Sequence, residues 1–137
     1  MKDLGITVLR IGMGALMLPH GIDKLTLLLS REEIAYPAVL GINPTLCLLF
    51  AVFAEIACAF FLIIGFKAKR SAIPLIISML ISIVYLQQTG NWGSRELPIA
   101  YLIGYLAVYF NGSGKYSLDT ALKNFKEEQA KLQLVDY

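Results

Sequence analysis

The sequence predicts an all-α integral membrane protein, a four-helix bundle with both termini inside (N-in, C-in) and a cytoplasmic amphipathic C-terminal helix. Hydrophobic residues make up 57% of the 137 residues and charged residues only 16%, which is too apolar for an ordinary soluble domain. Four apolar segments follow one another, and the last residues instead alternate apolar and charged positions at helical spacing. We therefore divide the chain into a membrane domain, residues 1–116, and an amphipathic tail, residues 117–137.

The first apolar segment, Leu4–Lys24, carries ionisable residues inside a stretch that is apolar enough to enter a bilayer. At 100° per residue, Arg10, His20 and Lys24 fall on one polar, small-residue face. An ionisable group at membrane depth costs about 2.5–3.5 kcal/mol on insertion scales and marks a site by default. A solvated histidine that merely ends the helix is the alternative interpretation of His20. The segment lacks a signal-peptidase cleavage pattern, so we expect a retained span.

Residues 25–43 are too short and too charged to form another span. They are typical either of a re-entrant or interfacial cover over the bundle or of an amphipathic surface loop. Both alternatives remain open.

The second span, Pro44–Phe66, has one charged residue, Glu55, at its centre. A carboxylate that faced lipid would be protonated or excluded, so we expect Glu55 to face the interior of the bundle. A buried hydrogen bond that only fixes the helix register is the alternative role.

The third span, Ser71–Thr89, places Ser78, Ser82 and Tyr85 on one side of a helix. Serines in membrane helices often bond back to their own carbonyls, so this stripe is weak evidence on its own. Together with Arg10 and Glu55 it indicates a polar interior.

The fourth span, Leu97–Phe110, has Glu96 just before it and covers only about 21 Å as a helix. The helix must therefore begin earlier or lie beside a thinned bilayer. Three tyrosines on one side of it are more typical of packing than of a cofactor platform. After it, Ser117 can cap a helix with one apolar face, which predicts either a surface helix or a docking element. That face comprises Leu118, Ala121, Leu122, Phe125 and Leu132.

The distribution of basic residues predicts the orientation in the membrane. The side of the N-terminus would carry eight of them, the opposite side three, and Arg10 is the twelfth; the eight are Lys2, Lys67, Lys69, Arg70, Lys115, Lys123, Lys126 and Lys131. The positive-inside rule then puts both termini in the cytoplasm. His20, Lys24 and Glu96 would lie at the outer face. The net charge of +2 does not suggest nucleic acid as a partner.

The depths of Arg10 and Glu55 along antiparallel helices match, so we hypothesise that they form an ion pair. This pair would be the floor of a ligand pocket with Ser78, Ser82 and Tyr85 in its walls. His20, Lys24 and Glu96 would stand at its outer mouth. The sequence does not single out catalytic residues among these eight candidates.

Several site classes are not expected. A single histidine cannot provide bis-histidine haem ligation, and no Cys, His and carboxylate cluster resembles a metal site. Cys47 and Cys58 lie about 16 Å apart along one helix, beyond disulfide reach. Glycine-rich nucleotide motifs are missing as well. We therefore expect neither a metal nor a covalently bound cofactor, and redox electrons would have to come from a bound quinone or from a partner protein.

Three segments together resemble the DoxX family of small four-helix membrane proteins. They are Arg10 with His20-Gly21-x-x-Lys24; Leu40–Pro44 with Glu55 and Gly65–Arg70; and Glu96-Leu97 with Gly112–Asp119. The resemblance points to Arg10, His20, Lys24, Glu55 and Glu96 as site residues. The chain departs from the pattern with Tyr85 and Gln88, where many relatives have a histidine.

The resemblance implies a membrane subunit of an oxidoreductase system in the bacterial cytoplasmic (inner) membrane, with a polar pocket for a quinone or a similar small molecule. A soluble oxidoreductase on the cytoplasmic side would be its partner, and a homo-oligomer is a further possibility. The alternative is a non-enzymatic protein that binds or transports a lipid or another small molecule.

Overall fold

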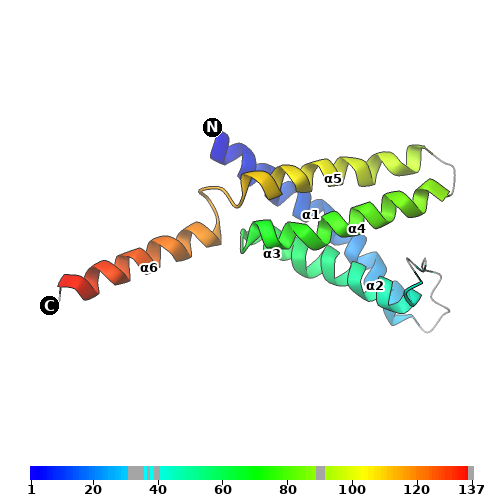
Figure 1. Cartoon of the computed structure of the whole chain (residues 1–137), viewed down its shortest axis with the longest axis horizontal. Helices are drawn as coiled ribbons and strands as arrows, with labels where there is room; N and C mark the ends of the chain where they lie inside the picture. Colours follow the sequence, from blue (N-terminus) through cyan, green and yellow to red (C-terminus); the bar gives the residue numbers. More distant parts are fainter. Residues whose placement is uncertain (31–35, 37, 39–40, 89–91, 136–137) are drawn as a thin grey trace.

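The computed structural model describes residues 1–30, 36, 38, 41–88 and 92–135, and the regular elements within these ranges are all helices. These are α1 (Lys2–Leu29), α2 (Pro44–Val52), the π-helix η1 (Phe53–Cys58), α3 (Ala59–Ile64), α4 (Ala68–Gln88), α5 (Gly93–Asn111) and α6 (Leu118–Val135). The segments α2, η1 and α3 follow one another without a break and form one rod. In Figure 1, α1, this rod, α4 and α5 run along the long axis as a bundle, and α6 leaves the bundle at the end where the N-terminus lies.

Three helices are long and apolar enough to cross a membrane, namely Lys2–Leu29, Pro44–Ile64 and Ala68–Tyr85. The protein is thus a helical integral membrane protein, as its composition predicts.

The helix bounds differ from the predicted spans in ways that have physical causes. The first helix continues past Lys24 to Leu29, so residues 25–29 belong to α1. Most of the rest of the 25–43 segment, including 31–35, 37 and 39–40, lies outside the described residues, and so does the choice between a re-entrant and a surface segment. The helix α5 begins at Gly93, which supplies the earlier start that the short fourth apolar segment requires.

The rod ends at Ile64 in a Schellman motif. Gly65 has φ +73°, its N–H donates to the Leu62 carbonyl (3.2 Å), and the Phe66 N–H donates to the Phe61 carbonyl (2.9 Å). The rings of Phe61 and Phe66 pack edge to face with centroids 5.8 Å apart, the apolar contact that accompanies this motif.

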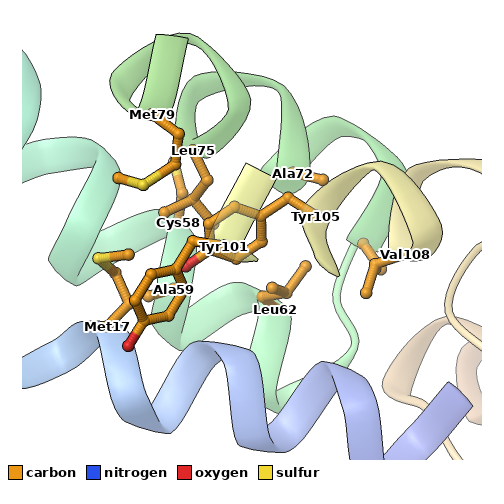
Figure 2. Close-up of a cluster of buried hydrophobic side chains, with 11 residues drawn as sticks. Met17, Cys58, Ala59, Leu62, Ala72, Leu75, Met79, Tyr101, Tyr105 and Val108 are labelled. Atoms are coloured by element: carbon orange, nitrogen blue, oxygen red, sulfur yellow. The ribbon is translucent and has the colours of Figure 1, made fainter. Parts of the chain in front are cut away.

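The core is built from small and aromatic side chains (Figure 2). A Cβ added to Gly14 would lie 2.9 Å from the Ala59 carbonyl oxygen, so α1 and α3 approach almost backbone to backbone. Tyr101 and Tyr105 of α5 are buried, in accord with the packing role that their spacing indicates. The other buried members are Met17, Cys58, Leu62, Ala68, Ala72, Leu75, Met79 and Val108.

The predicted C-terminal helix is confirmed as α6. Ser117 caps it, since its hydroxyl accepts a hydrogen bond from the Thr120 N–H (3.3 Å). The division at residue 116 stays a prediction, and Asp119 ties the first turn of α6 to the bundle because its N–H donates to the Gly65 carbonyl (3.1 Å).

Candidate functional site

A cavity of about 220 Å³ lies between α1, η1, α4 and α5. We call it the polar pocket, and its lining comprises Met17, His20, Lys24, Glu55, Met79, Ser82, Ser94, Leu97, Pro98 and Tyr101. Four of the eight candidate residues, His20, Lys24, Glu55 and Ser82, thus share one wall.

Glu55 is the buried centre of this site, with no exposed surface. Its Oε1 atom forms an ion pair with the Lys24 ammonium and accepts a hydrogen bond from the Ser78 hydroxyl (3.0 Å). Its Oε2 atom is buried and has no hydrogen-bond partner among the described residues. Buried polar atoms are nearly always paired, so an unpaired carboxylate oxygen beside a cavity calls for an explanation.

The backbone around Glu55 is unusual as well. Glu55 lies in the π-helix η1, and such π segments inside α-helices are frequent at functional sites. The α1 helix packs directly on this segment at Gly21, where an added Cβ would lie 2.9 Å from the Glu55 carbonyl carbon and 2.7 Å from Ile56 Cγ1. The contact between Gly21 and η1 therefore fixes where Glu55 stands relative to Lys24.

His20 and Tyr101 flank the opening of the polar pocket. Their rings meet edge to face, with centroids 6.1 Å apart and planes at 85°. His20 is exposed, whereas Tyr101 is buried and donates its hydroxyl to the Leu16 carbonyl (3.2 Å). That carbonyl lies three residues before Pro19, where the proline disturbs the backbone hydrogen bonds of α1.

The predicted ion pair between Arg10 and Glu55 is wrong. Arg10 is buried, but its Nη1 atom donates to the carbonyls of Leu62 (2.8 Å) and Ile63 (2.9 Å), and its Nη2 atom donates to the Tyr116 carbonyl (2.8 Å). The guanidinium thus satisfies the last carbonyls of α3 and adds a cation at the negative end of that helix.

The direction of helical side chains explains this outcome. Cα–Cβ bonds tilt toward the N-terminus of their own helix, so Arg10 leans away from the membrane centre. By the same rule, Lys24 leans from the far end of α1 back toward the centre, where Glu55 lies.

The remaining candidates divide between the pocket and the surface. Ser78 reaches Glu55, and Ser82 lines the polar pocket while it donates to the Ser78 carbonyl (2.9 Å), the back-bonding that membrane serines favour. Tyr85 and Glu96 are exposed and do not belong to the lining of the pocket. Whether any of these residues binds a ligand stays a prediction.

Several lining residues escaped the sequence-based prediction. Ser94, Pro98 and Tyr101 of α5 lie at spacings of four and three residues, which puts them on one helix face toward the pocket. Met17 of α1 is on the small-residue face of its helix, and Met79 has no distinguishing pattern. The π-helix leaves no sequence signal of its own.

A second cavity, of about 420 Å³, lies between α2 and α4 and is lined almost wholly by apolar side chains. We call it the apolar cavity; Tyr36, Phe50, Ala51, Ile77 and Ser78 are among its lining residues. Burial and the charges of Glu55 and Cys47 raise the pKa of Tyr36 to about 12, so its hydroxyl keeps its proton at neutral pH. Ser78 lines this cavity and donates to Glu55, so the carboxylate lies between the two cavities.

Within the described ranges, no group of three or more His, Cys, Asp or Glu residues is placed to hold a metal ion. The polar pocket instead offers an ammonium, an imidazole, hydroxyls and one free carboxylate oxygen. Such a set can hydrogen-bond a small molecule that both accepts and donates.

Comparisons with known proteins place this architecture in a family. No curated protein and no solved structure matches the chain significantly. The model of the DoxX family matches residues 5–88, more than half of the chain, and this range includes Arg10, His20, Lys24 and Glu55 but ends before Glu96 and the Gly112–Asp119 run. The match confirms the resemblance that the sequence motifs carry. The chain therefore belongs to the DoxX family.

Proposed function

We propose that this DoxX-family membrane protein is a subunit of an oxidoreductase system, and that its polar pocket receives the ring of a quinone. The single observation that carries the proposal is the buried, unpaired Oε2 atom of Glu55 beside the pocket. A quinol hydroxyl could donate to this oxygen. On the same wall, the Lys24 ammonium and the His20 imidazole are donors for a quinone carbonyl.

The size of the pocket fits a head group better than a whole ligand. Its volume of about 220 Å³ lies below the roughly 300–1,000 Å³ that sites for complete small molecules occupy. A quinone ring would enter the pocket while its isoprenoid tail stays in the bilayer. Because the chain itself is not expected to carry a redox centre, the electrons would come from a soluble oxidoreductase bound on the side of α6.

The proposed orientation is four spans in the bacterial inner membrane with both termini in the cytoplasm. The fourth span is α5, whose 19 residues cover about 28 Å as a helix, close to the hydrocarbon thickness of roughly 30 Å. Cysteine labelling tests it: in a chain with Cys47→Ser and Cys58→Ala, Ser113→Cys should react from the cytoplasm and Ser94→Cys from outside. Labelling of Ser113→Cys from outside would contradict the orientation.

A quinone-binding experiment tests the site. Purified full-length protein in detergent would be titrated with a short-tailed ubiquinone by calorimetry, alongside Glu55→Gln and the matched control Glu96→Gln. A hydrogen bond to a charged group is worth about 1.5–3 kcal/mol, so Glu55→Gln should weaken binding by about 10- to 100-fold. Glu96→Gln removes an exposed carboxylate outside the pocket and should change affinity less than about two-fold.

The apolar cavity favours a second candidate function, the binding of a lipid chain without redox chemistry. Mass spectrometry of the small molecules that co-purify with the protein separates the two. Co-purified quinone supports the first proposal. Co-purified phospholipid, together with no quinone binding by the unmodified protein, would overturn it in favour of the second.

A further inference from the structure

A third cavity, of about 480 Å³, lies at the other end of the bundle from the opening of the polar pocket, where α4 begins and α5 ends. We call it the basic cavity. It is lined by Lys67, Lys69 and Arg70, by the loop Asn111–Gly114, and by Asp119 and Thr120 at the start of α6. Its volume falls within the roughly 300–1,000 Å³ of small-molecule sites.

The charges of this cavity are unbalanced. Asp119 is the one acid in the lining, and its carboxylate is already engaged because it accepts hydrogen bonds from the backbone N–H groups of Lys67 (2.8 Å) and Ala68 (3.4 Å). The Lys67 ammonium lies over the Phe66 ring, 5.2 Å from its centroid. Among the described residues, neither Lys69 nor Arg70 forms an ion pair. The cavity therefore presents two cations that lack a carboxylate partner in the described part of the chain.

The loop that faces these cations leaves space for a ligand. Gly112 has φ +80°, and a Cβ added there would lie 3.2 Å from Lys69 Cε, so the lysine stem lies along a backbone that has no side chain. Ser113, between Gly112 and Gly114, adds a hydroxyl to the lining. Two cations and a hydroxyl around an open volume match the needs of a phosphate group, which has several acceptor oxygens.

The position of the cavity relative to the spans supports the same ligand class. The third candidate span begins at Ala68, so Lys67, Lys69 and Arg70 lie at the boundary between lipid and water. Phosphates of lipid head groups lie at this depth, and basic pockets between membrane helices bind acidic head groups.

We propose that the basic cavity is a binding site for a phosphate-bearing anion, held by Lys69 and Arg70 with the Ser113 hydroxyl. The phosphate belongs either to the head group of an anionic phospholipid or to a free anion from the aqueous phase. This site is separate from the polar pocket, and the proposal does not depend on quinone binding.

The lipid arm of the test measures head-group preference by native mass spectrometry. Delipidated full-length protein would be incubated with equal amounts of phosphatidylglycerol and phosphatidylcholine, and bound lipids would be counted. The unmodified protein should prefer phosphatidylglycerol. The variant Lys69→Gln/Arg70→Gln should lose up to about 30-fold of that preference, roughly five-fold for each basic residue near the surface.

A matched control carries the same change of charge outside the cavity. Lys123→Gln/Lys126→Gln removes two positive charges from the exposed side of α6 and should keep the lipid preference. A second pair of variants leaves the basic residues in place: Ser113→Asp, which adds a negative charge in the cavity, should weaken the preference, whereas Ser113→Asn should not.

The free-anion arm uses inorganic phosphate at constant ionic strength, with the melting temperature as readout. A rise for the unmodified protein but not for Lys69→Gln/Arg70→Gln, without a lipid preference, would assign the phosphate to the aqueous phase. The proposal is overturned if neither phosphatidylglycerol nor phosphate discriminates between these two proteins. It is also overturned if the Lys123→Gln/Lys126→Gln control loses the preference to the same extent.

Discussion

Lys24 and Glu55, 31 positions apart in the sequence, form the ion pair that joins α1 to the π-helix η1 at the wall of the polar pocket. The two side chains lean toward each other because each points toward the N-terminus of its own helix, and these helices run in opposite directions. The Lys24 side chain is 24% exposed, whereas Glu55 is fully buried. The pair therefore connects the buried carboxylate to the opening of the pocket.

Removing one partner of this pair should cost more stability than removing both. Lys24→Met leaves the Glu55 carboxylate buried with only the Ser78 hydroxyl, and breaking a buried pair costs about 3–5 kcal/mol. The double variant Lys24→Met/Glu55→Gln should lose less than either single change predicts by addition. The measurement is thermal unfolding of the four proteins in one detergent, and strictly additive losses would contradict a coupled pair.

Arg10 and Glu55 should behave as independent sites. Their hydrogen-bond partners in the described structure are different residues, Leu62, Ile63 and Tyr116 for Arg10 against Lys24 and Ser78 for Glu55. The losses from Arg10→Met and Glu55→Gln should thus add to within about 0.3–0.5 kcal/mol in the double variant. A clear departure from additivity in the same unfolding measurement would restore the direct pairing that the hydrogen bonds of Arg10 argue against.

Gly65→Ala should destabilise the protein strongly. Gly65 has φ +73°, and an added Cβ would overlap the Arg10 guanidinium and lie 2.6 Å from Ser117 Cβ. The αL conformation alone costs an L-residue about 1–2 kcal/mol, and displacement of Arg10 adds to it. Gly12→Ala is the control, because its Cβ meets no atom within 4 Å and alanine favours the helix by about 0.5–1 kcal/mol. Equal melting temperatures for the two variants would refute the prediction.

Asp119→Ala should weaken the start of α4 although Asp119 belongs to α6. Its carboxylate accepts from the Lys67 and Ala68 N–H groups, so it acts as an N-cap supplied from another helix. Loss of such a cap costs about 0.5–2 kcal/mol of the free energy of unfolding. Glu127→Ala, on the exposed part of the same helix, should change stability by less than about 0.5 kcal/mol. A smaller loss for Asp119→Ala than for Glu127→Ala would count against the capping role.

The sequence carries enough information to predict the helical membrane class and the inward position of Glu55, because apolar length and the cost of a buried charge depend on composition alone. It could not identify the partner of Arg10, since the acceptors are backbone carbonyls at a helix end, and every residue has a carbonyl. The same limit applies to η1, which depends on how Gly21 of α1 packs against it. Depth along a helix was a poor guide to pairing, because Arg10 and Lys24 share one face and differ in which way they lean.

The hydrogen bond between Arg10 and the Tyr116 carbonyl joins positions 106 residues apart and has a consequence for how the protein is made. Chains are synthesised from the N-terminus, so Arg10 enters the membrane long before any of its three acceptors exist. Leu62 and Ile63 arrive with the second half of the rod, and Tyr116 only after α5. A nascent chain therefore carries an incompletely satisfied cation until nearly all of it has left the ribosome, and completion of synthesis coincides with closure of the bundle.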